Sequence, residues 1–159
     1  MLDKNKFIVF FVFFISFTFI CEINSVFSSD KEILKFKDSI KLLKEKKFPE
    51  AISSLKTISD DNNLKAQHML SQILYSGNIT TQDFEKSYYW ANIAKLGGYK
   101  KSEKIVELLN DLLDENQKIT INKSIKSFLE KKAMEYNKLA IIQIAKWYLT
   151  LSEEIDYEN

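Results

Sequence analysis

Histidine is the side chain best suited to acid–base catalysis near neutral pH, and this chain of 159 residues contains only one, His68. Nucleophilic catalysis needs a base beside an activated serine or cysteine. No cysteine, second histidine or serine–base pair stands near His68 in the sequence. Together with its neighbour Gln67, it falls on the expected solvent side of a helix. We therefore interpret His68 as a surface residue.

The acidic residues show no arrangement typical of a catalytic or metal-binding site. The run at residues 60–63, Asp-Asp-Asn-Asn, lacks the spaced acidic ligands and the terminal glutamate of a calcium loop, so it predicts a polar turn. No paired carboxylates, phosphate loop or nucleophile elbow is present either. The sequence therefore predicts no catalytic residue, no metal ion and no cofactor, and we expect that the protein is not an enzyme.

The charge balance argues against nucleic-acid binding, and the cysteine content argues against disulfides and cysteine metal sites. The formal net charge is +1, and every basic residue apart from the histidine is lysine. Nucleic-acid binding favours a net basic face with arginine for bidentate base contacts, so we expect no nucleic-acid partner. The single cysteine, Cys21, lies near the N-terminus, which leaves the rest of the chain without a disulfide or a cysteine metal site.

Residues 1–28 have the organisation of a signal peptide. Two lysines precede an apolar run over residues 7–20, whose length fits a signal-peptide core, and we expect cleavage after Ser28. The alternative is an uncleaved anchor, because the run is at the border of membrane-spanning length. We therefore expect an exported protein, either periplasmic or anchored in the inner membrane and facing the periplasm. It would meet a membrane only through this segment.

The stretch over residues 66–102 predicts two helices joined by a loop. Gly77 ends the first helix, because glycine takes the left-handed C-terminal conformation at little cost. Asp83 offers a side-chain oxygen to cap the second helix, and Gly97-Gly98 closes it. The apolar positions are Ala66, Met69, Leu70, Ile73 and Leu74 in the first helix, and Phe84, Tyr88, Ala91 and Ala94, with Trp90 and Ile93 beside them, in the second.

This stretch resembles the Sel-one-like repeat, a relative of the tetratricopeptide repeat. The residues at the family's spacings are Ala66, Leu70, Gly77, Asp83, Lys86, Trp90, Ala94 and Gly98. Serines replace three of the family's small residues, at Ser71, Ser87 and Ser102. The resemblance implies an all-α fold, a short right-handed α-solenoid of antiparallel helical hairpins, in a protein that binds other proteins.

The remaining segments are expected to extend this pattern with a period of about 36 residues. Residues 29–65 predict a degenerate tetratricopeptide-like hairpin, residues 103–136 a terminal helical pair, and residues 137–159 a last helix whose acidic tail frays. The expected inner faces are Ala51, Leu55 and Ile58; Ile105, Leu108, Leu109 and Leu112; Ile121, Ile125, Phe128 and Leu129; and Leu139, Ile142, Ala145 and Leu149.

A partner-binding face is expected around the exposed aromatic residues of the central repeat. Adjacent helical residues point about 100° apart, so the run Tyr88-Tyr89-Trp90 cannot lie wholly in one core. Tyr89 and Tyr99 are the expected exposed anchors, with Lys86 and Lys95 offering contacts to acidic partner residues. The competing interpretation is that these aromatic residues only pack within the hairpin.

The resemblance implies an adaptor or scaffold that binds another protein or a peptide. A regulatory inhibitor or immunity-type protein, which neutralises one enzyme, is the first alternative. A small hydrolase on a helical scaffold is the second, and the lone His68 counts against it. The incomplete last repeat also leaves self-association open.

Overall fold

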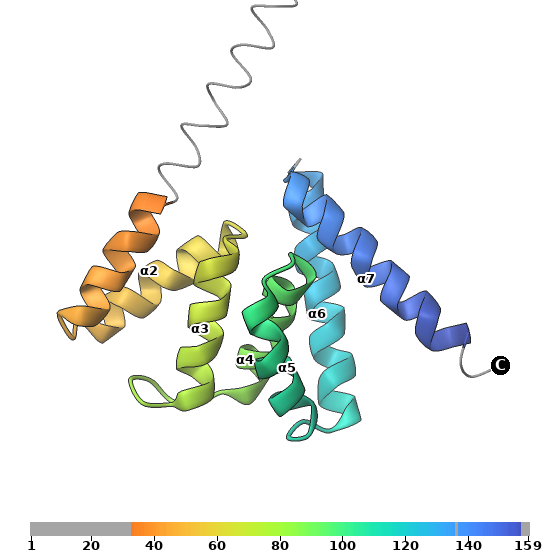
Figure 1. Cartoon of the computed structure of the whole chain (residues 1–159), viewed down its shortest axis with the longest axis horizontal. Helices are drawn as coiled ribbons and strands as arrows, with labels where there is room; N and C mark the ends of the chain where they lie inside the picture. Colours follow the sequence, from red (N-terminus) through yellow and green to blue (C-terminus); the bar gives the residue numbers. More distant parts are fainter. Residues whose placement is uncertain (1–32, 136, 157–159) are drawn as a thin grey trace, which may run out of the picture.

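The computed structural model describes residues 33–135 and 137–156 of the chain (Figure 1). The predicted signal segment, residues 1–28, lies outside the described residues. All the regular structure in the described region is helical, which confirms the expected all-α class. Among the helices described, none combines the length and the apolar character needed to cross a membrane.

Two helices precede the central stretch. The first covers residues 33–44, and α2 follows at Phe48–Asp60. Pro49 lies in the first turn of α2, where the missing N–H costs no helical hydrogen bond. The predicted inner face of α2 is confirmed, because its three residues are all buried: Ala51, Leu55 and Ile58.

The central stretch forms the two predicted helices, α3 at Leu64–Ser76 and α4 at Phe84–Leu96. Gly77 ends α3 with a φ of 65°, the left-handed conformation expected of it. The Asp83 carboxylate caps α4 by accepting a hydrogen bond of 2.8 Å from the backbone N–H of Lys86. The local signals at both helix ends are thus confirmed.

Small residues let these two helices approach closely. Ser71 and Ser87 are fully buried, and the Ser87 hydroxyl donates to the Ser71 carbonyl at 2.8 Å. A β-carbon added at Gly97 would meet the methyl groups of Leu64, which would have to move. The serines therefore fill, with satisfied hydroxyl groups, positions where a larger side chain would separate the helices.

The rest of the chain is also helical. The short 3₁₀ helix η1, at Lys100–Ser102, leads into α5 at Glu103–Asn110. The long helix α6, at Glu115–Met134, begins with a reciprocal capping box at Asp114. The last helix, α7, runs from Lys138 to Asp156.

Packing occurs mainly between helices that are neighbours in the sequence. The pairs α2–α3, α3–α4, α4–α5 and α6–α7 are in contact, and α4 also contacts α6 and α7. Helix α4 is therefore at the centre, while α7 lies at one edge of the molecule (Figure 1). Trp90 of α4 is buried in the larger core cluster, with its ring edge-on to Phe128 of α6 at 5.9 Å between centroids.

The inner face predicted for α5 is partly wrong. Leu108 and Leu112 are exposed, whereas Val106 and Leu113 are buried. For Leu112 the reason is that α5 ends at Asn110, whereas Leu108 lies within α5 but outside its buried face. Leu112 and Leu113 lie in the turn that follows, where helical spacing no longer decides which side chain points inward.

The inner face predicted for α7 is also wrong. Ile142, Ala145 and Leu149 are exposed, and the face turned towards the rest of the molecule includes Ala140 and Gln143, both fully buried. A buried glutamine is invisible to a search for apolar spacing, so the predicted face is rotated around the helix. The helix also continues to Asp156, past the point where fraying was expected.

Candidate functional site

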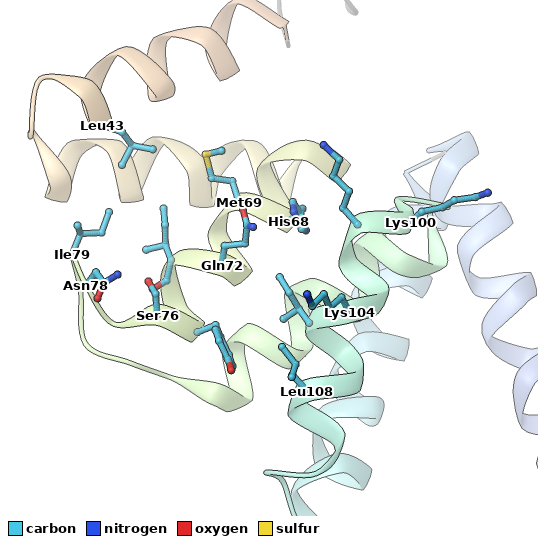
Figure 2. Close-up of a pocket in the computed structure, with 14 residues that line it drawn as sticks. Leu43, His68, Met69, Gln72, Ser76, Asn78, Ile79, Lys100, Lys104 and Leu108 are labelled. Atoms are coloured by element: carbon cyan, nitrogen blue, oxygen red, sulfur yellow. The ribbon is translucent and has the colours of Figure 1, made fainter.

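An open groove of about 830 Å³ lies between the first helical pair and α5, over one side of α3. Figure 2 shows Leu43, Ile79 and Leu108 reaching into this space from different elements, with Met69 and His68 of α3 between them. The loop after α3 forms one end of the groove, and η1 with the start of α5 forms the other.

The walls of the groove are largely apolar. Leu43 and Ile79 pack with the smaller core cluster while still lining the groove. The side chain of Leu108 is 43% exposed and lines the groove. Concave apolar surface of this kind is typical of binding sites, because it desolvates the ligand's apolar groups.

Three lysines line the η1–α5 end of the groove: Lys100, Lys101 and Lys104. All three are exposed, and none of them is in an ion pair with another described residue. Their positive charges are therefore available to a ligand. The groove thus presents an apolar floor next to a positively charged rim.

His68 is not the surface residue that we expected. It is only 7% exposed, and its Nδ1 lies 3.0 Å from the Ser102 hydroxyl, in hydrogen-bond contact. The ring also packs against that of Tyr99, with 4.9 Å between the centroids. Burial lowers the pKa of His68 below its usual 6.5, and the nearby charge of Lys101 lowers it further. His68 is buried because η1 folds back over α3, an arrangement that helical periodicity within α3 does not reveal.

The contact between His68 and Ser102 brings together two residue types used in nucleophilic catalysis. Ser102, however, is fully buried, so in this conformation its hydroxyl is closed to a substrate carbonyl. The contact instead joins η1 to α3 at the groove, which His68 itself lines. Within the described residues there is also no group of three or more histidine, cysteine or acidic side chains placed to hold a metal ion.

The predicted binding residues Tyr89 and Lys86 lie outside the groove. Tyr89 is only partly exposed, with its ring packed edge-on to Trp90 at 4.8 Å and to Phe128 at 6.2 Å between centroids. Burial raises the pKa of the Tyr89 hydroxyl, and the charge of Asp60 adds to this effect. Lys86 is exposed and forms an ion pair of 2.7 Å with Asp83. Tyr89 is thus largely a packing residue rather than the exposed anchor expected.

The predicted residues Tyr99 and Lys95 lie in two different places. Tyr99 is partly exposed next to the groove, through its contact with His68. Lys95 lines a second hollow of about 870 Å³ between α4, α5, α6 and α7. The structure therefore does not gather the four predicted residues into one surface, and only Tyr99 adjoins the groove.

No protein-family model matches this chain, and no match was found among the curated proteins or the solved structures.

The groove residues were missed at the sequence level, although part of the signal is present there. Lys101, Lys104 and Leu108 are spaced as neighbours on one helical face, which is a common pattern at binding surfaces. The contributions of Leu43 and Ile79 come from distant segments. They are brought to the groove only by the packing of the first helical pair and by the course of the loop after α3.

Proposed function

We propose that this protein is an exported Sel-one-like repeat protein that binds another protein as an adaptor or scaffold. Its helices would form a short right-handed α-solenoid of antiparallel hairpins, located in the periplasm or held in the inner membrane facing it. The motif residues support this proposal, because Gly77 and Asp83 end and begin helices as the repeat requires, and Trp90 lies in the core.

The observation that most directly supports a binding function is the groove with its lysine rim. Its apolar walls would take the apolar side chains of a partner segment, and Lys100, Lys101 and Lys104 would meet its carboxylates. The partner segment is therefore an acidic, amphipathic stretch of another protein. Rim charges of this kind mainly accelerate association and select the partner, so binding should weaken as salt is raised.

The test is a cross-linked capture experiment in the organism that produces the protein. The wild-type chain is compared with the double variant Lys101→Glu/Lys104→Glu. A matched control, Lys56→Glu/Lys65→Glu, makes the same change in net charge on exposed lysines that do not line the groove. We expect a partner that the wild type and the control recover and the groove variant loses.

Recovery of the same partner by both double variants would show that the groove is not the binding site. The number of partners separates the adaptor from the inhibitor alternative. An adaptor recovers several proteins or a large assembly, whereas an inhibitor or immunity-type protein recovers one enzyme, tightly and in a salt-sensitive manner. Adding the purified chain to that enzyme would then abolish its activity.

A further inference from the structure

His68 is a basic side chain of the groove that the lysine rim does not include. It lines the groove, although most of its surface is buried (Figure 2). One ring nitrogen, Nδ1, is occupied by the 3.0 Å contact with the Ser102 hydroxyl. The other, Nε2, forms no hydrogen bond with a described residue, and it does not belong to the described side-chain atoms that are buried without a partner. Nε2 is therefore open to the groove.

The charged side chains around His68 are basic. Lys100 and Lys101 of η1 and Lys104 of α5 line the same groove, and no carboxylate of the described residues lines it. The charge of Lys101 lowers the pKa of the ring, and no acidic residue of the described helices packed around α3 acts on the ring in the opposite direction. The empty groove therefore favours neutral His68, because a charged ring would be partly desolvated and would face other positive charges.

A carboxylate in the groove would reverse this balance. In contact with Nε2, it supplies the negative charge that the surroundings of the ring lack, and so it favours the imidazolium form. The contact with Ser102 does not prevent protonation, because a serine hydroxyl can accept a hydrogen bond as well as donate one. The ring can thus carry a proton on both nitrogens, with Nδ1 donating to the Ser102 hydroxyl and Nε2 donating to the bound carboxylate.

We propose that His68 is a fourth basic contact of the groove, which binds a carboxylate of the partner segment through Nε2 and takes up one proton from the solvent as it does so. This inference rests on the proposed function, since it concerns the same groove and the same class of partner. Because proton uptake and binding are linked, the partner binds more tightly as the pH falls below neutrality. The lysines alone give no such dependence, since they stay charged over this range.

An acidic peptide tests this coupling on the full chain, held in mild detergent. The probe is a labelled amphipathic peptide of leucine and glutamate with capped ends, whose dissociation constant is measured by fluorescence anisotropy at constant ionic strength. Its glutamates stay largely ionised between about pH 7.5 and about pH 5.5. A contacting opposite charge shifts a pKa by about 1 unit or more, so we expect the wild type to bind roughly fivefold more tightly at the lower pH. His68→Gln, which has an amide in place of the ionisable ring, should bind with the same affinity at both pH values.

A nuclear magnetic resonance titration of the wild type gives a second measurement that needs no variant. His68 is the only histidine, so its ring protons report its pKa directly. We expect this pKa to rise by about 1 unit or more when the peptide saturates the groove. Partial unfolding at low pH would weaken binding, which is opposite to the expected change and so cannot imitate it.

The outcomes separate the role of His68 from the function of the groove. Peptide binding that Lys101→Glu/Lys104→Glu abolishes, with no rise in the pKa of His68, would overturn this inference and leave the groove as the binding site. A pH dependence of binding that persists in His68→Gln would also overturn it, because another group would then take up the proton. Absence of peptide binding, or binding that survives the change of both lysines, would overturn the groove as a site for acidic segments and this inference with it.

Discussion

The side-chain amide of Gln143 donates from Nε2 to the backbone carbonyl of Ile93 across 2.8 Å and so joins α7 to α4. Its Oε1 accepts a 2.7 Å hydrogen bond from Nδ2 of Asn62, in the turn between α2 and α3. The Oδ1 atom of Asn62 in turn accepts from Gln67 Nε2 at 2.9 Å. These three buried amides connect the α2–α3 turn, helices α3 and α4, and the last helix.

Asn62 suits this network for a backbone reason as well. Its φ of 67° is in the left-handed region, which asparagine tolerates better than most residues other than glycine. The turn that follows α2 can therefore reverse the chain and still direct an amide towards α7. A buried polar network of this kind favours one arrangement of the helices, because another arrangement would break these hydrogen bonds. Among the atoms of these three amides, Gln67 Oε1 is buried without a hydrogen-bond partner.

We expect Gln143→Leu to destabilise the protein. The substitution keeps a side chain of similar size but removes both hydrogen bonds, although the Ile93 carbonyl still accepts from the Gly97 N–H and the Asn62 amide keeps its longer contact with Asn137. Each lost hydrogen bond lowers the free energy of unfolding by about 0.5–1.5 kcal/mol. Urea unfolding followed by circular dichroism measures the loss. Gln72→Leu, at an exposed glutamine of α3, is the matched control and should change stability little. Equal stability of the two variants would show that the network does not stabilise the fold.

Trp90→Ala should lower the free energy of unfolding more than any other single truncation in α3 or α4. Trp90 is buried between Tyr89 and Phe128, and its removal empties a core site worth about 3–5 kcal/mol. Thermal unfolding of this variant is compared with that of Tyr148→Ala, which truncates a half-exposed aromatic residue on α7. An unchanged melting temperature for Trp90→Ala would contradict the core position of this residue.

Local features of the fold could be predicted from the sequence, because neighbouring residues determine them. Gly77 ends α3 and Asp83 caps α4, and each acts within one turn of its own helix. The burial of Trp90 also follows from the pattern of apolar residues within its own helix, α4. The right-handed solenoid itself stays a prediction that the chain's resemblance to the repeat family supports.

Features that depend on distant segments could not be predicted in this way. Gln143 is buried because a carbonyl of α4 and an amide of the α2–α3 turn meet it, and neither is near it in the sequence. Tyr89 is partly covered because α6 places Phe128 against it. The groove likewise needs the first helical pair, the loop after α3 and α5 together. Apolar periodicity describes one helix at a time, so it gives no information on these contacts.

The burial of His68 predicts how stability depends on pH. The pKa of His68 in the folded protein is lowered by burial and by Lys101, whereas in the unfolded chain it stays near the usual 6.5. As the pH falls through 6.5, the unfolded state therefore takes up a proton before the folded state does. Proton uptake by the unfolded state lowers the free energy of unfolding, so stability is fully present above pH 6.5 and decreases below it, until the folded pKa is reached.

This pH window belongs to one residue, because His68 is the only histidine in the sequence. Aspartate and glutamate side chains ordinarily titrate near pH 4, well below the start of the window. Urea unfolding between about pH 7.5 and pH 5.5 should show a decrease in the wild type that is absent in His68→Gln, whose amide can still contact the Ser102 hydroxyl. The control is Gln72→His, which adds a histidine at an exposed position. Because a solvated histidine has nearly the same pKa in the folded and unfolded states, this variant should show the same pH dependence of stability as the wild type. A wild-type profile that is flat over this range would mean that His68 is not held in the buried, neutral state that its contacts with Ser102 and Tyr99 imply.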